Sequence, residues 1–230
     1  MNPRAVFLDA GNTLFRPFPS VGSVYARVAR RHGAKVPSDE VQRRFEAEWA
    51  RHNRLAGLKH EKDEKRWWSK LVRNVFGDAF RNEKTFAAYF EELHHEFAMP
   101  RTWRLYPDAL PALKALRRRG FILGIVSNWD SRLFSLCDGL GVTPHVNFIL
   151  ASAVEGTSKP EKEIFRRALR RAGVRPDEAL HVGDSFREDY LGASRAGISA
   201  KLLCRDGKRR RDAECITSLK ELAAAARALT

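Results

Sequence analysis

Long hydrophobic runs are missing from this 230-residue sequence, and no stretch reaches the roughly 20 apolar residues that span a bilayer. We expect no signal peptide and no membrane partner, because Asp9 interrupts the only apolar run near the start. The sequence also lacks internal repeats and low-complexity linkers. Cysteine is scarce, and Cys137, Cys204 and Cys215 are too far apart for a metal knuckle. An odd number of free thiols predicts a cytoplasmic protein in a reducing compartment.

Acidic residues are also outnumbered by basic ones. The sequence has 42 lysines and arginines and 28 aspartates and glutamates, which gives a formal net charge of +14. Most of the excess is scattered among acidic residues at helical spacing, as in 61–66, which is typical of a solvated helix face. The two dense basic clusters, 117–119 and 208–211, contain no aromatic residues that could stack on bases. We therefore expect no nucleic-acid partner, while the positive field attracts small phosphorylated molecules.

The chain is organised around the stretch from Val6 to Phe15. Its first three residues are apolar and too few for a helix, which predicts a buried parallel strand that ends at Asp9. Gly11 permits a sharp turn after the strand, and the hydroxyl of Thr13 can donate a hydrogen bond to a bound phosphate. Because α/β sheets bind ligands at the carboxyl ends of their strands, we predict a site at Asp9.

Three further apolar runs end in polar side chains in the same way, over 121–126, 148–150 and 179–183. The residues that follow these runs supply a hydroxyl, an amide, a lysine and a carboxylate: Ser127, Asn128, Lys159 and Asp184. If the strands are parallel neighbours, these groups gather at one edge of the sheet beside Asp9.

Between Arg16 and Met99 the strand signals vanish, and four helical patterns cover residues 21–32, 39–56, 62–76 and 83–97. We interpret their aromatic residues as the core of a helical bundle rather than as a ligand site. The adjacent Trp67 and Trp68 cannot both face that core. One of them lines a cleft, contacts the rest of the protein as part of a lid, or is simply exposed.

After this block helices and strands alternate, which implies parallel pairing with right-handed crossovers. Helices are predicted over 108–119, from 130, over 161–172, near 189–196 and over 218–229, and the last strand over 200–203. The predicted fold is α/β, a doubly wound parallel sheet with an inserted α-helical domain.

On these motifs the chain resembles the haloacid dehalogenase (HAD) superfamily, mostly phosphatases that act through an aspartyl-phosphate, over essentially its whole length. The resemblance implies a Rossmann-like core of residues 1–15 and 101–230 and a C1-type helical cap of residues 16–100. The hinges of the cap are expected near 15–17 and 100–101. The chain more loosely resembles the uncharacterised "haloacid dehalogenase-like hydrolase domain-containing" group.

The resemblance also implies roles for single residues. Asp9 matches the nucleophile of the superfamily, Ser127 its phosphate-binding hydroxyl and Lys159 its lysine, while Asp184 and Asp189 match its acidic fourth motif. We expect Asp189 to orient the lysine or a metal-bound water rather than to bind a metal directly.

The implied cofactor is Mg²⁺, held by Asp9, the carbonyl of Gly11 and Asp184, because this ion takes oxygen ligands and keeps several waters. Asn128 is a further candidate for phosphate binding, although an asparagine after a strand often only satisfies turn backbone. Asn12 stands where glycine is usual in the superfamily.

The main departure from the pattern is Gly11, which stands where the phosphatases usually carry a second aspartate as general acid and base. Losing such a group typically costs about 10²- to 10⁴-fold in rate. We therefore expect slow turnover of alkyl phosphates, a smaller loss with good leaving groups, or a substitute acid from the cap. The candidate substitutes, each equally typical of a solvated helix, are Glu48, His52, His94 and His95.

The sequence thus predicts a magnesium-dependent hydrolase of the HAD type, a phosphatase that acts on a small phosphorylated metabolite. Two alternatives stay open. The 2-haloacid dehalogenases also lack the second aspartate, but they need no metal, and the Asp184/Asp189 pair would repel a haloacid carboxylate. The other alternative is a non-catalytic phosphate-binding regulatory protein that has kept the pocket and lost the chemistry.

Overall fold

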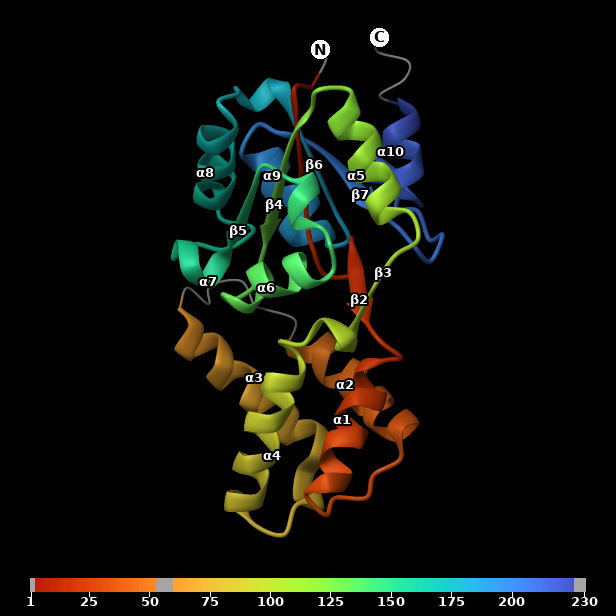
Figure 1. Ribbon diagram of the computed structural model, residues 1–230, viewed down its shortest axis with the longest axis vertical. Helices are drawn as coiled ribbons and strands as arrows, with labels where there is room; N and C mark the ends of the chain where they lie inside the picture. The colour runs from red at the N-terminus through yellow and green to blue at the C-terminus, as the bar shows by residue number, and fades with distance from the viewer. Residues whose placement is uncertain (1–2, 53–59, 226–230) are drawn as a thin grey trace.

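The computed structural model describes residues 3–52 and 60–225, with the side chains of 52 and 223–225 left out. Within these residues one sheet has six parallel strands in the order β5-β4-β1-β6-β7-β8 (Figure 1). The strands are β1 (Ala5–Leu8), β4 (Ile122–Ser127), β5 (Phe148–Ala151), β6 (Ala179–Gly183), β7 (Ser199–Leu203) and β8 (Cys215–Ile216). The predicted doubly wound α/β fold is confirmed.

The strand β1 lies at the centre of the sheet, and its residues alternate between two hydrophobic cores. Val6 and Leu8 pack on one side, in a core shared with α5 (Ala109–Arg118), α6 (Arg132–Gly139) and α10 (Leu219–Ala225). Ala5 and Phe7 pack on the other side, in a core shared with α8 (Lys162–Ala172) and α9 (Gly192–Arg195). This alternation is what a strand with a side-chain period of two produces between two helical layers.

The register of the sheet gathers the strand ends. Leu8 pairs with Ile125 of β4 on one side and with Val182 of β6 on the other. The residues that follow these three strands therefore emerge at the same edge. The strand order also reverses at β1, which is the position where open α/β sheets form a ligand-binding crevice.

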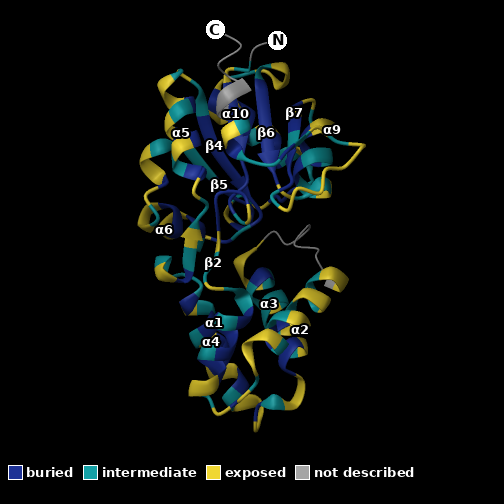
Figure 2. Ribbon diagram, turned by 90° about the vertical axis from the view of Figure 1, so that its right-hand side faces the viewer, coloured by how far each residue is buried: buried dark blue, intermediate teal, exposed yellow. Residues whose placement is uncertain are grey.

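The four helices between residues 17 and 100 form a second lobe with its own hydrophobic core, which faces the carboxyl edge of the sheet (Figure 1). They are α1 (Val21–Arg31), α2 (Ser38–His52), α3 (Glu61–Phe76) and α4 (Glu83–Glu96). These helices match the four predicted patterns, except that the predicted residues 53–56 lie outside the described part of the chain. The exposed faces of the helices point outward and their buried faces point toward one another (Figure 2).

A two-stranded antiparallel ribbon, β2 (Phe15–Pro17) with β3 (Trp103–Leu105), joins the two lobes. β2 covers the expected hinge at 15–17, whereas the other expected position, 100–101, lies in η2 (Pro100–Thr102), just before β3. The hinges and the domain boundaries stay predictions. The sequence analysis did not predict these strands, because three residues are too few to show an alternating pattern.

The structure corrects two other predictions in the second half of the chain. The strand over 200–203 is not the last, because β8 pairs with β7 after a loop that holds the basic cluster 208–211. The helix predicted near 189–196 is instead a π-helix, η5 (Phe186–Leu191), followed by α9. The remaining short helices are α7 (Ser152–Glu155), η1 (Gly77–Ala79), η2 (Pro100–Thr102), η3 (Thr143–His145) and η4 (Pro176–Glu178).

The three cysteines are free thiols. Among the helices of the described residues, none combines the length and the apolar character that a membrane crossing requires.

Candidate active site

The carboxylate of Asp9 lies directly after β1 and is almost buried. Its Oδ1 accepts hydrogen bonds from the Ser127 hydroxyl at 2.8 Å and from the Lys159 ammonium at 2.6 Å. Within residues 3–52 and 60–225, no hydrogen bond reaches its Oδ2. Two groups therefore fix the orientation of the carboxylate through one oxygen and leave the other available for chemistry.

Lys159 lies between two carboxylates. Its ammonium is 2.6 Å from Oδ1 of Asp9 and 2.6 Å from Oδ1 of Asp189. Burial alone would lower the pKa of Lys159, but the charges of Asp189 and Asp9 outweigh it and raise that pKa. The lysine is therefore a permanent cation beside the candidate nucleophile.

Asp189 comes from the π-helix and is fully engaged with protein groups. Its Oδ1 also contacts Nε2 of His181 at 2.9 Å, and its Oδ2 accepts the backbone N–H of Ser185 at 3.0 Å. Burial opposes ionisation of this carboxyl, but Lys159 and His181 nevertheless hold its pKa below the ordinary value. The contacts place Asp189 where it was predicted, against the lysine.

Asp184 follows β6 and is exposed at the cavity rather than buried in the core. Desolvation by the walls of the cleft and the charges of Asp9 and Asp189 raise the pKa of Asp184 to about 8. Oxygen atoms of these three carboxylates lie within 4.8 Å of one another. Because the oxygens of Asp189 are already bonded, Asp9 and Asp184 are the available ligands, and Gly11 lines the same cavity. This uncompensated set of oxygen donors fits a hard divalent cation such as Mg²⁺.

The other predicted phosphate-binding residues lie in different settings. Asn128 lines the cavity, but its amide donates to the carbonyl of Lys159 and to Glu188, and its Oδ1 accepts the N–H of Lys159. It therefore holds the lysine loop in place. Thr13 is fully buried and does not line the cavity, and its hydroxyl has no partner among the described residues. Phosphate binding by either residue remains a prediction.

The backbone of Asn12 explains a substitution that the sequence left open. Asn12 has φ of 52°, in the left-handed region that glycine adopts freely and that asparagine tolerates better than most residues. Its backbone N–H donates to the carbonyl of Phe15, and its carbonyl accepts from Arg205. Asparagine can therefore replace glycine at this position, because both residues adopt the left-handed backbone conformation of the turn.

Gly11 lies against an indole that the sequence analysis did not single out. A Cβ atom at Gly11 would stand 3.2 Å from Cζ3 of Trp129. Trp129 itself packs edge-on against Phe15 and beside Trp103. The position of the missing general acid is thus covered by an aromatic ring, and the only sequence signal was that Trp129 directly follows Ser127-Asn128.

Few of the predicted substitute acids reach the cavity. Glu48 and His95 do not line it, and the side chain of His52 lies outside the described residues. His94 does line it, but burial and the charge of Arg132 lower its pKa to about 4, so it is neutral near pH 7.

Two carboxyls that the sequence analysis missed also line the cavity. Burial, with Asp130 nearby, raises the pKa of Glu64 to about 7, and burial raises that of Glu188 to about 7. Glu188 accepts a hydrogen bond from the amide of Asn128, and Glu64 lies on the cap helix α3.

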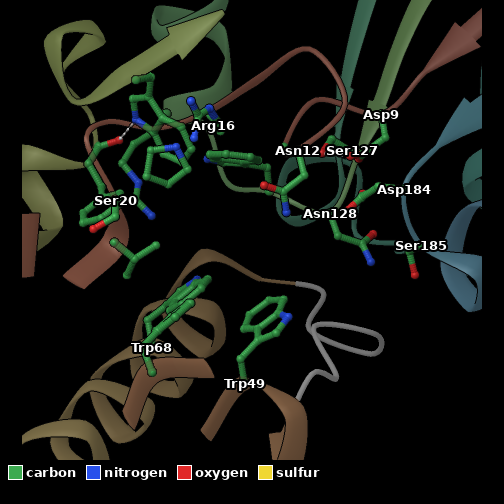
Figure 3. Close-up of a pocket in the computed structure, with 18 of the residues that line it drawn as sticks. Asp9, Asn12, Arg16, Ser20, Trp49, Trp68, Ser127, Asn128, Asp184 and Ser185 are labelled. Carbon is green, nitrogen blue, oxygen red and sulfur yellow. Dashed lines mark hydrogen bonds between the residues drawn. The ribbon is translucent and has the colours of Figure 1, made fainter. Parts of the chain in front are cut away.

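The cavity has a volume of about 900 Å³ and is formed by both lobes (Figure 3). Trp67 and Trp68 both pack against the core of the helical lobe, so the prediction that only one could do so is wrong. Only Trp68 lines the cavity. Several aromatic residues of the bundle core, Trp49 and Phe90 among them, also form its wall, so bundle core and ligand site are not separate here.

Fold and site together define a hydrolase-type α/β protein with a helical cap over an aspartate-based centre. The profile described as "Hydrolase: haloacid dehalogenase-like hydrolase" matches residues 3–197. The chain therefore belongs to the haloacid dehalogenase-like hydrolase family, and the resemblance seen in the sequence is confirmed.

Individual relatives agree with this assignment. The chain is 34% identical over 204 residues to the bovine (Bos taurus) "Haloacid dehalogenase-like hydrolase domain-containing protein 3", covering 87% of this chain and 81% of the relative. A HAD phosphatase from Thermococcus onnurineus is 27% identical with a TM-score of 0.68, covering 98% and 97% of the two chains. An L-2-haloacid dehalogenase from Xanthobacter autotrophicus, solved with chloropropionic acid covalently bound, has a TM-score of 0.72 over 99% and 100%. It is 18% identical and shows the shared fold alone.

Proposed function

We propose that this protein is a magnesium-dependent phosphoric monoester hydrolase that acts on a small phosphorylated metabolite, with Asp9 as its nucleophile. The observation that carries the proposal is the orientation of the Asp9 carboxylate. Its Oδ1 accepts hydrogen bonds from Ser127 and Lys159, while its Oδ2 accepts none from the described residues. A carboxylate attacks phosphorus only when the phosphoryl charge is neutralised, and the permanent cation of Lys159 lies at that point.

The chain's own residues account for two displacement steps. In the first, an oxygen of Asp9 bonds to phosphorus while the bond from phosphorus to the leaving oxygen breaks. In the second, water attacks phosphorus and gives up a proton to solvent while the bond from phosphorus to the Asp9 oxygen breaks, which releases inorganic phosphate and the free carboxylate. Ser127 and Lys159 hold the carboxyl group of Asp9 in both steps, as the attacking group in the first and as the leaving group in the second. A magnesium ion held by Asp9, Asp184 and the Gly11 carbonyl would supply additional positive charge for the phosphoryl oxygens.

A second candidate, 2-haloacid dehalogenation, is favoured by one observation. Gly11 has no side chain that could donate a proton to a leaving group at Asp9, and a departing halide needs no proton. The acidic cluster opposes it, because the substrate of that reaction is itself a carboxylate and would add negative charge beside groups whose charges already raise the pKa of Asp184 to about 8.

The three free thiols support a cytoplasmic location.

The test measures phosphate release from 4-nitrophenyl phosphate and chloride release from 2-chloropropionate, each with and without Mg²⁺. We expect phosphate release that needs Mg²⁺ and is lost in Asp9→Asn. Chloride release at the same rate with and without Mg²⁺ would favour the dehalogenase. Tight binding of inorganic phosphate with no product from either substrate would favour a non-catalytic phosphate-binding protein.

A further inference from the structure

We infer that the leaving group accepted at this site is aromatic, so that the substrates are aryl phosphates, the phosphate esters of phenols. The inference rests on the proposed function and names its substrate class. Two independent features carry it: the ring that covers the position of the missing acid, and the aromatic walls of the cavity.

The first feature concerns the proton that an alcohol leaving group requires. Gly11 has no side chain that could donate this proton, and a Cβ atom added there would stand 3.2 Å from the indole of Trp129. Of the other carboxyls that line the cavity, Asp184 is a candidate metal ligand, Glu188 accepts a hydrogen bond from Asn128, and Glu64 lies on the cap helix α3. An alkoxide has a conjugate acid of pKa near that of water, about 16, and departs poorly without a proton. A phenolate, whose conjugate acid has a pKa of about 10, departs without one.

The second feature is the wall formed by the cap. The rings of Phe45 and Trp49 stack at 6.0 Å with an interplanar angle of 20°, and Trp49 stacks on Trp68 at 5.7 Å and 15°. All three line the cavity. Trp67 stands edge-on to both indoles from outside the cavity. Flat aromatic surfaces of this kind favour a planar ring over a polar or flexible group.

Aromatic side chains of both lobes line the cavity. Figure 3 shows Trp49 and Trp68 rising from the cap on one side, with Asp9, Ser127 and Asp184 on the core side. Trp129 lines the cavity from the core and lies against Gly11. With about 900 Å³, the cavity has far more room than a phosphate group needs and lies in the range of drug-sized ligand sites. A phosphoryl group at Asp9 therefore places its leaving ring between aromatic walls.

Positive charge at the cavity favours an anionic ester over a neutral aromatic compound. Arg16 and Arg187 both line the cavity and are exposed, and no ion pair to either is formed within the described part of the chain. The guanidinium of Arg16 lies 5.8 Å from the ring centre of Tyr106. These cations attract a phosphate dianion toward Asp9 without being neutralised by protein carboxylates.

The experiment compares kcat/KM for phenyl phosphate, benzyl phosphate and cyclohexyl phosphate in the presence of Mg²⁺. Benzyl phosphate keeps the aromatic ring but has an alcohol leaving group. Cyclohexyl phosphate has neither an aromatic ring nor a phenol leaving group. We expect phenyl phosphate to exceed cyclohexyl phosphate by about 100-fold or more, and benzyl phosphate to show a low kcat with a KM close to that of phenyl phosphate. Across substituted phenyl phosphates, kcat/KM should fall steeply as the pKa of the phenol rises.

Matched variants test the aromatic wall. Trp68→Leu should reduce the preference for phenyl over cyclohexyl phosphate by about tenfold, while Trp67→Leu, one residue away and outside the cavity, should keep it. The preference is a ratio within one preparation, so partial unfolding of a variant does not change it.

The possible failures are distinguishable. Asp9-dependent phosphate release with similar kcat/KM for phenyl and cyclohexyl phosphate, or a flat dependence on the phenol pKa, would overturn the aryl class and leave the proposed function intact. A phenyl preference equally reduced in Trp67→Leu and Trp68→Leu would also overturn it. If none of the esters gives phosphate release that depends on Asp9, the result contradicts the proposed function itself, and the inference that rests on it.

Discussion

The ammonium of Lys159 lies 2.6 Å from Oδ1 of Asp189, and both side chains are almost completely buried. This pair joins the segment between α7 and α8, which carries Lys159, to the middle of β6, because Asp189 also contacts His181. The same ammonium donates a hydrogen bond to Asp9. The position of the candidate nucleophile therefore depends on Asp189, although both oxygens of Asp189 are bonded to protein groups and are not available to the substrate.

Replacing Asp189 tests that dependence. In Asp189→Asn, Lys159 keeps only one of its two carboxylate partners, and losing a partner from a buried ion pair typically costs about 3–5 kcal/mol. We expect a lower free energy of unfolding in urea together with a reduced kcat. The control is Asp177→Asn, which removes an exposed carboxylate that pairs only with neighbouring Arg175. Equal stability of the two variants would contradict the proposed dependence.

Restoring an aspartate at Gly11 should be costly for a steric reason. In Gly11→Asp the new Cβ stands 3.2 Å from the indole of Trp129, and overpacking of this kind costs about 1–3 kcal/mol. We expect Gly11→Asp to lower the free energy of unfolding less in the Trp129→Leu background than in the wild type. A double-mutant cycle measured by urea unfolding should therefore show a coupling energy between the two positions. Strictly additive losses would show that Trp129 does not occupy the space of the missing acid.

Glu64 should make stability depend on pH. Its pKa is about 7 in the folded protein against 4.5 ordinarily, because burial and Asp130 disfavour its charged form more than Arg132 favours it. The folded state therefore binds the proton more tightly. Stability falls by up to about 1.4 kcal/mol per unit as pH rises from 4.5 to about 7, and changes no further above that.

The measurement is thermal unfolding at several pH values between 4.5 and 8. Glu64→Gln should remove this contribution, so its Tm relative to wild type should be higher at pH 8 than at pH 5. Glu91→Gln, at an exposed position of the next helix, should follow the wild type. A difference between Glu64→Gln and wild type that does not vary with pH would contradict the prediction.

Magnesium should stabilise the protein through Asp184. A ligand that binds only the folded state at 100 times its dissociation constant adds about 2.7 kcal/mol, which raises Tm by several degrees. We expect this shift in the wild type and its loss in Asp184→Asn, whereas Asp138→Asn, an exposed position on α6, should keep it. A Mg²⁺-dependent shift that survives in Asp184→Asn would place the ion elsewhere.

The fold was largely predictable because short apolar runs that end in polar residues indicate buried strands, and amphipathic helices have a strong periodic signal. The strand before Asp9, the runs ahead of Ser127 and Asp184, and the four cap helices all lie where the sequence predicts them. The ribbon β2–β3 and the strand β8 could not be predicted, because two or three residues carry no period and pair only when the rest of the fold brings them together.

The polar centre was also accessible from the sequence, whereas the cavity was not. Strand ends gave Asp9, Ser127, Lys159 and Asp184, since parallel strands deliver their final residues to one edge. The indole of Trp129 over Gly11 arises from packing between segments far apart in the chain. Local patterns carry no trace of such a contact.

The most direct test of the central claim is to mix the enzyme with phenyl phosphate and Mg²⁺, quench in acid within one turnover, and map phosphorylated peptides by mass spectrometry. The account predicts a phosphoryl group on the peptide that contains Asp9, present in the wild type and missing in Asp9→Asn. Undiminished phosphate release by Asp9→Asn, with no phosphoryl group on that peptide in the wild type, would contradict it.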